Sequence, residues 1–111
     1  MKLFEKIRTL QSDTYEYYLP KAIKQLEKVV YEAAKKGFDE VKIPDKGRVT
    51  DVNYELNSEI NCIQKVLLLK PNDFIDAVRE NFELTSKNAY FEKGFGTNFY
   101  MIIDWSELYA E

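Results

Sequence analysis

An apolar series in the first third of the chain constrains the fold more than any other feature, because it repeats at the spacing of an α-helix. Its members are Tyr18, Ala22, Leu26, Val29 and Ala33, at steps of four, four, three and four residues. Side chains at these steps share one face of a helix, and that face must be buried against other parts of the chain. Lys35 and Lys36 suit the last turn of such a helix, and Gly37 is a typical residue for ending it.

The stretch before this series also has helical spacing. Leu3, Ile7 and Leu10 recur at steps of four and three residues, with charged residues between them. Pro20 follows this stretch and biases Leu19 towards an extended conformation. The sequence therefore predicts either two helices or one kinked helix in this part of the chain.

A short strand is predicted directly after the first helical region. Val41 and Ile43 alternate with Glu40 and Lys42, and Pro44 ends the run. Alternation of this kind places the apolar side chains on one face of a strand of about five residues.

Two further helices are predicted in the middle of the chain. The first has Thr50 or Asp51 as its N-cap, and the second begins at Asn72 or Asp73. The apolar residues of the first are Val52, Leu56, Ile60, Ile63 and Leu67, and those of the second are Phe74, Ile75, Val78 and Phe82. The run from Val66 to Leu69 also fits a strand, and periodicity alone does not separate the two interpretations.

The chain closes with two predicted extended segments, Phe82 to Phe91 and Asn98 to Trp105. The connection between them contains two glycines and is of the β-hairpin type. Both faces of the second segment are largely apolar, which is typical of a strand that is central or covered on both sides.

These elements predict a single α+β domain over residues 1–111, with a small antiparallel or mixed sheet of about three strands packed against two to four helices. Hydrophobic residues make up 45% of the chain, which is enough to form a core without a disulfide or a metal. The residues expected in the core are Leu26, Val29, Val41, Ile43, Leu56, Ile60 and Ile102.

Composition narrows the chemistry. The chain has no histidine, so the commonest general base and metal ligand is missing, and its single cysteine, Cys62, cannot form an internal disulfide. The net charge of −3 argues against a dedicated nucleic-acid-binding protein. The N-terminus lacks a signal-peptide core, and no apolar run is long enough to span a bilayer. We therefore expect a cytoplasmic protein with no membrane partner, no catalytic residues, no cofactor and no metal.

Two stretches resemble small accessory proteins encoded by tailed phages. The first runs from Leu26 to Ile43, where a helix ends in Ala-Ala-Lys-x-Gly and a strand follows. The second runs from Phe82-Glu-Leu to Tyr100-Met-Ile-Ile-Asp-Trp105 and closes on Ile-x-Trp. The match covers roughly residues 22–105. The resemblance implies a protein that acts in the host cytoplasm, where it binds a host protein to inhibit or redirect it.

Glu40 and Lys42 form a Glu-x-Lys pair on a predicted strand, a pattern found in metal-dependent nucleases. In such sites the carboxylate holds Mg²⁺ and the lysine stabilises charge on the scissile phosphate. A further acidic ligand from a neighbouring strand is needed, and the upstream segments are predicted to be helical. The sequence therefore favours a charged, solvent-exposed strand edge over a nuclease site.

A lysine stripe is the second feature relevant to nucleic acid. It consists of Lys21, Lys24, Lys28 and Lys35 on one side of the predicted helix. Lysines arranged in this way can neutralise phosphates. Glu27 and Glu32 interrupt the surface, however, and no arginine accompanies the stripe, so a solvated helix face is favoured and a nucleic-acid partner is not expected.

The aromatic residues indicate a binding surface. The chain has eight Tyr and seven Phe, concentrated in residues 15–18 and 90–100. Aromatic side chains are enriched at protein interfaces, and Phe95 lies between two glycines at the predicted hairpin tip, with few ways to be buried by its own chain. In the alternative interpretation the rings cover the sheet and the hydroxyls reach water. The residues predicted to bind a partner are Tyr90, Phe91, Phe95 and Tyr100.

Together these features predict a small non-enzymatic protein-binding module, which the phage resemblance would make an inhibitor or modulator. Its partner is expected to be a host protein or a second copy of this chain. The alternative is a metal-dependent nuclease or nucleic-acid-binding accessory protein that uses Glu40, Lys42 and the lysine stripe.

Overall fold

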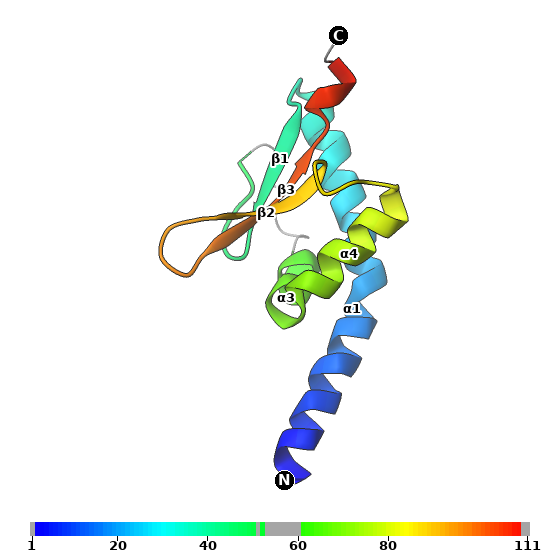
Figure 1. The fold of residues 1–111 in the computed structure, drawn as a ribbon, viewed down its shortest axis with the longest axis vertical. Helices are drawn as coiled ribbons and strands as arrows, with labels where there is room; N and C mark the ends of the chain where they lie inside the picture. Colours follow the sequence, from blue (N-terminus) through cyan, green and yellow to red (C-terminus); the bar gives the residue numbers. More distant parts are fainter. Residues whose placement is uncertain (1, 51, 53–60, 110–111) are drawn as a thin grey trace.

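The computed structural model describes residues 2–50, 52 and 61–109. Over these residues a long helix and a strand are followed by two helices, a β-hairpin and a short 3₁₀ helix (Figure 1). The elements are α1 (Lys2–Lys35), β1 (Glu40–Pro44), α3 (Asn61–Leu69), α4 (Pro71–Phe82), β2 (Ala89–Lys93), β3 (Phe99–Asp104) and η1 (Ser106–Tyr109). The fold is α+β, as predicted.

The described strands form one antiparallel sheet in the order β1–β3–β2, so β3 is central. Ile103 lies opposite Val41 of β1 on one side and opposite Ala89 of β2 on the other. The largely apolar character of both faces of β3 predicted a central or covered strand, and this prediction is confirmed.

The extended segment predicted from Phe82 to Phe91 is wrong in its first part. Helix α4 continues to Phe82, and β2 begins only at Ala89. Phe82 continues the apolar face of α4 that carries Phe74 and Val78, at steps of four residues. Helical periodicity therefore describes this residue better than its β-propensity does.

The middle of the chain is helical in its described part. The run from Val66 to Leu69 belongs to α3, so the strand interpretation is wrong. Helix α4 begins at Pro71, slightly earlier than predicted, because proline is favourable in the first turn of a helix. Of the predicted start of the first of these helices, Thr50 and Val52 are described and lie in a turn and a bend, with Val52 buried. Asp51 and the residues from 53 to 60, including the core residues Leu56 and Ile60, lie outside the described residues.

One continuous helix, α1, occupies the region where the sequence predicted either two helices or one kinked helix. Pro20 lies inside it and is exposed, so the backbone carbonyl that lacks its helical donor can face water. The N-terminal end of α1 extends well beyond the rest of the molecule (Figure 1). The whole molecule, α1 included, measures 56 × 29 × 29 Å along its principal axes. Within the described residues, no helix combines the length and the apolar character needed to cross a membrane.

Gly37 ends α1 as predicted. Its φ is +92°, its N–H donates to the Ala34 carbonyl at 3.0 Å, and the next residue, Phe38, donates to the Ala33 carbonyl at 3.1 Å. These two bonds are those of a Schellman motif, which satisfies the last carbonyls of a helix and needs a left-handed residue at this position.

The core lies between α1, α3 and one face of the sheet. That face carries Val41 and Ile43 of β1 together with Met101 and Ile103 of β3. Ile102 is also buried, but it points to the opposite face because side chains alternate along a strand. All predicted core residues that the structure describes are buried: Leu26, Val29, Val41, Ile43 and Ile102.

Candidate functional site

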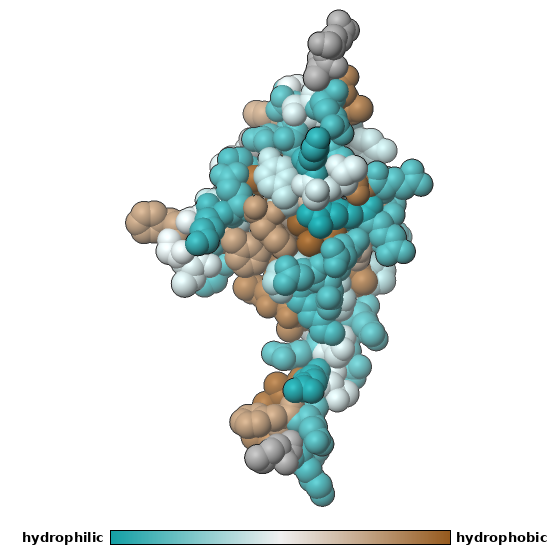
Figure 2. Space-filling model, viewed as in Figure 1, coloured by the Kyte–Doolittle hydropathy of each residue, from teal (hydrophilic) through white to brown (hydrophobic). Residues whose placement is uncertain are grey.

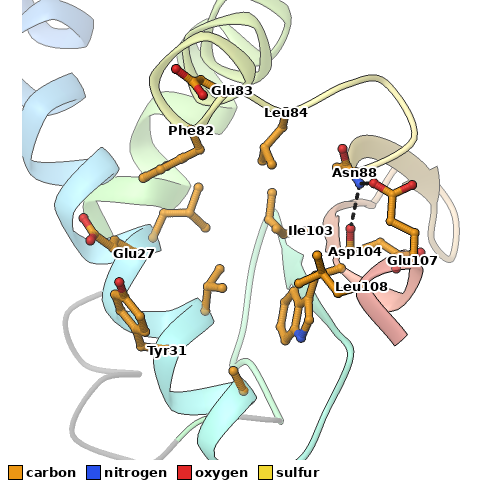
Figure 3. A pocket seen from close by; sticks show the side chains of 14 residues that line it. Glu27, Tyr31, Phe82, Glu83, Leu84, Asn88, Ile103, Asp104, Glu107 and Leu108 are labelled. Carbon is orange, nitrogen blue, oxygen red and sulfur yellow. Dashed lines mark hydrogen bonds between the residues drawn. The ribbon is translucent and has the colours of Figure 1, made fainter. Parts of the chain in front are cut away.

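An open groove of about 550 Å³ lies between the C-terminal half of α1 and the end of the sheet (Figure 3). A groove of this size is within the usual range for ligand pockets. Helix α1, the end of α4, β3 and η1 all contribute to its walls. Its apolar floor is formed by Leu26, Val30, Phe82, Leu84 and Ile103, and the exposed Leu108 also lines it.

The margin of the groove is acidic. Glu27 of α1, Glu83 after α4 and Glu107 of η1 lie around it, on three separate elements (Figure 3). Among the described lining residues, none is Lys or Arg. The groove therefore combines an apolar floor with a margin of a single sign of charge, and it favours a ligand that is both apolar and cationic.

Asn88 holds one wall of the groove in place. This residue is only 8% exposed. Its Nδ2 donates to Glu107 Oε1 at 2.7 Å and to the Asp104 carbonyl at 3.3 Å (Figure 3), and its Oδ1 accepts from the Thr85 N–H at 3.1 Å. A buried amide with its donors and acceptor used fixes the relative position of the turn after α4, β3 and η1.

Asp104, at the end of β3, lines the groove, and its carboxylate is held by neighbours on the sheet face of Tyr90 and Ile102. Its Oδ1 accepts the Ser106 N–H at 2.8 Å. Hydrogen bonds from the Ser106 hydroxyl and backbone, and then from the Tyr90 hydroxyl, lower the pKa of Asp104 below its ordinary value. Partial burial, followed by the nearby Asp104 charge, raises the pKa of Tyr90. Asp104 is thus an anion at neutral pH, and its carboxylate is already hydrogen-bonded by Ser106 and Tyr90.

Glu83 has a strained backbone. It is the residue that ends α4, with φ of 55° and ψ of 46°, and the N–H of Leu84 donates to the Arg79 carbonyl at 2.8 Å. A left-handed residue is favourable here only if it is glycine, and a side chain costs about 1 kcal/mol. The left-handed residue ends α4 as Gly37 ends α1, and Glu83 lines the groove from this position.

Sequence reasoning missed the groove because its residues are distant in sequence and meet only in the folded chain. One signal was available. Val30 and Ala34 extend the apolar face of α1 beyond the predicted stripe, at steps of four from Leu26. The apolar face of α1 is therefore wider than packing against the core requires. The extra width indicates a second apolar surface beside the core.

The hairpin carries the four residues that the sequence predicts to bind a partner, and the structure separates them. Phe95 is 93% exposed at the tip, and Figure 2 shows the hairpin protruding from the body with hydrophobic atoms at its end. The strand register places Tyr90 and Tyr100 on the face of Ile102. Phe91 lies on the opposite face, where its ring meets Phe99 edge to face at 5.5 Å between centroids and packs against the core. The four side chains therefore do not form one continuous patch.

The Glu-x-Lys pair lies on β1, with its two side chains in different surroundings. Lys42 forms an ion pair with Glu92 of β2 at 3.6 Å. Glu40 lies opposite Asp104 in the strand register, so a second carboxylate does come from a neighbouring strand. Within the described residues, no group of three or more His, Cys, Asp or Glu is placed to hold a metal ion.

The lysine stripe lies on the solvent side of α1. All four lysines are exposed, and Lys21 donates to the Tyr17 hydroxyl at 3.2 Å. In the tyrosine cluster, Tyr15 is buried and Tyr18 is half-buried beside Lys65, which donates to its hydroxyl at 3.0 Å. The N-terminal aromatics are therefore divided between core and surface.

Hydrophobic side chains also gather at the free end of α1 (Figure 2). Leu3 and Leu10 are 66% and 65% exposed, and Phe4 and Ile7 are exposed as well. Within the described residues, exposed apolar side chains thus occur at this helix end, at the hairpin tip and around the acidic groove, and also singly at positions such as Phe38 and Leu68. Comparison with known proteins adds no further identification, since no family model, no curated protein and no solved structure matches this chain.

Proposed function

We propose that this chain is a non-enzymatic protein-binding module whose groove takes an apolar side chain flanked by basic residues on its partner. The observation that carries the proposal is the combination of an apolar floor with the carboxylates of Glu27, Glu83 and Glu107 and no basic lining residue among those described. An apolar side chain that enters the groove gains the transfer energy of its buried area. A Lys or Arg beside that side chain is attracted by the carboxylates of the margin. This attraction speeds the association of a basic partner and disfavours an acidic one.

The groove is a better candidate for the main binding surface than the hairpin. It is concave and has its wall fixed by Asn88, so a partner would meet a preformed site. Phe95, by contrast, is a single exposed ring, because Phe91 is turned towards the core. Phe95 remains a predicted contact, and the resemblance to accessory proteins of tailed phages favours a host protein as the partner. Occupying a surface of such a protein is how a module of this size would inhibit or redirect it.

The experiment uses two synthetic helical peptides that carry the same apolar residues and differ only in their flanking residues, Lys and Arg in one and Glu in the other. Fluorescence anisotropy gives their affinities for the full chain, and two-dimensional NMR shows which amides shift. We expect the basic peptide to bind at least about tenfold more tightly, which is about 1.4 kcal/mol, and to shift the resonances of Val30, Leu84 and Leu108.

Ala34→Arg is the variant that closes the groove, because Ala34 is exposed on α1 and lines the groove. Its matched control is Thr9→Arg, which adds the same charge to an exposed position of the same helix outside the groove. Only the first should weaken the basic peptide. Equal binding of both peptides, or binding that survives Ala34→Arg and is lost in Phe95→Ala, would move the interface away from the groove.

A further inference from the structure

The N-terminal end of α1 carries an apolar face that nothing in the described chain covers. Every residue from Lys2 to Gln11, which we call the arm, is exposed. The arm is continuous with a helix that is held to the body farther on, where Tyr15 is buried and Lys70 Nζ donates to Ser12 Oγ at 2.9 Å. A helix extended from a docked segment does not need a new nucleus, so the arm can be helical without a partner.

The apolar residues of the arm follow the spacing of a coiled coil. Leu3, Ile7 and Leu10 recur at steps of four and three residues, and the polar Thr14 and Tyr17 continue the same line beyond the arm; we call these five residues the seam. In heptad positions it places leucine at d and isoleucine at a in the arm, which are the apolar core positions of a coiled coil.

The seam does not coincide with the face that packs on the body. That face begins at Tyr15, and Thr14 of the seam is its neighbour in sequence, so the two directions differ by about 100° around the helix. A second helix lying along the seam would therefore lie beside the body and would not compete with the core for the same side of α1.

The charges that flank the seam specify the partner and its direction. Lys6 and Asp13 occupy g positions, and Phe4 and Gln11 occupy e positions. Consider an antiparallel pair of these arms in which Ile7 packs against Leu10 of the second copy. In this pair the g positions of the two helices face each other, so Lys6 lies opposite Asp13 of the second copy. The two-fold symmetry forms this ion pair twice. A parallel pair would set Lys6 against Gln11 and form neither pair.

We propose that the arm is a homodimerisation element, in which two copies of this chain pair antiparallel along the seam. The contact is isologous and closes on itself, so it forms dimers and no filaments. The pairing is short, at the lower end of specific interfaces, and the dimer should dissociate on dilution. The protein is therefore bivalent when dimeric, with two grooves and two hairpin tips.

The first test is sedimentation equilibrium of the full chain over a wide concentration range. We expect a monomer–dimer equilibrium that Leu10→Glu weakens by at least about tenfold. Thr9→Glu, which adds the same charge to an exposed position off the seam, should have a smaller effect. Circular dichroism checks that each variant is folded. A monomer at every concentration, or equal effects of the two changes, would overturn the proposal.

Charge exchange tests the partner assignment. Lys6→Glu and Asp13→Lys should each weaken the dimer, because like charges then face one another, and the double variant Lys6→Glu/Asp13→Lys should restore it. A double variant no better than the single ones would contradict the antiparallel register. Loss of dimer in Ala34→Arg would show that the arm enters the groove of the second copy, which also contradicts pairing along the seam.

Disulfide trapping tests the direction. In a Cys62→Ser background, Ile7→Cys and Leu10→Cys should crosslink poorly when each is oxidised alone. The mixture of the two should crosslink efficiently, because position 7 of one copy meets position 10 of the other. More efficient crosslinking of either variant alone would indicate a parallel pair and would overturn the proposed arrangement.

Discussion

The two ends of α1 have similar apolar spacing and opposite surroundings. The C-terminal half buries Ala22, Leu26 and Val29 against α3 and the sheet, and Leu26 is 1% exposed. The arm repeats apolar residues at helical steps as well, yet Leu10 is 65% exposed. Helical periodicity thus shows which residues share a face. Whether that face is covered depends on where the rest of the chain lies, and an uncovered apolar face is a candidate interaction surface.

The same substitution made in both halves of α1 tests this difference most directly. Leu26→Ala removes a fully buried side chain and should lower the free energy of unfolding by about 2–5 kcal/mol, through lost transfer energy and a cavity. Leu10→Ala should change the stability of the monomer by less than about 0.5 kcal/mol, because it is exposed and alanine suits a helix. Chemical denaturation at low protein concentration measures both. Equal losses would mean that the arm packs against its own body.

The end of the docked half should be more sensitive than its neighbouring position. Gly37→Val places a β-branched residue at φ of +92°, and the expected cost is at least about 1–2 kcal/mol. Lys36→Val, one residue earlier on an exposed site just after α1, is the control and should cost no more than about 0.5 kcal/mol. Similar thermal unfolding of the two variants would contradict the role of Gly37 as the helix terminator.

Pro20 lies between the two halves and should limit how strongly they are coupled. Pro20→Ala restores a backbone donor inside an existing helix, and we expect a gain in unfolding free energy of about 1 kcal/mol, reduced by the greater freedom of the unfolded chain. Amide hydrogen exchange should become slower in the arm. With alanine at position 20 the backbone hydrogen bonds of α1 are uninterrupted, so the arm can no longer open separately at the position where Pro20 lacks its N–H. Unchanged exchange rates in the arm would mean that it opens independently of Pro20.

The hairpin tip provides the smallest expected change in stability. Phe95→Ala should alter the melting temperature very little, with a change in unfolding free energy below about 0.5 kcal/mol, because the ring is 93% exposed. Differential scanning calorimetry measures it, and Phe91→Ala is the matched comparison because that ring packs against the core. A large loss of unfolding free energy in Phe95→Ala would show that this ring contributes to the stability of the fold although it is exposed.

The sequence predicted only some of the charged residues that surround the candidate site, and it did not predict that they lie together. The sequence identifies Glu27 as an interruption of the lysine stripe, but the groove is made when Glu83 and Glu107 arrive beside it from two other elements. The same holds for the Glu-x-Lys pair. The carboxylate that faces Glu40 comes from Asp104, more than sixty residues farther along the chain, as shown by the strand register.

Sequence alone was sufficient where the determining interactions are local. The steps of three and four residues in α1, the alternation in β1 and the glycine after Lys36 each depend on backbone hydrogen bonds and side-chain directions within a few residues. Only the tertiary structure decided which apolar surfaces are covered. It turned Phe91 to the core and Tyr90 away from it, left the arm exposed and assembled the groove from four elements. Burial depends on contacts between segments far apart in the chain, and spacing within a single segment does not specify those contacts.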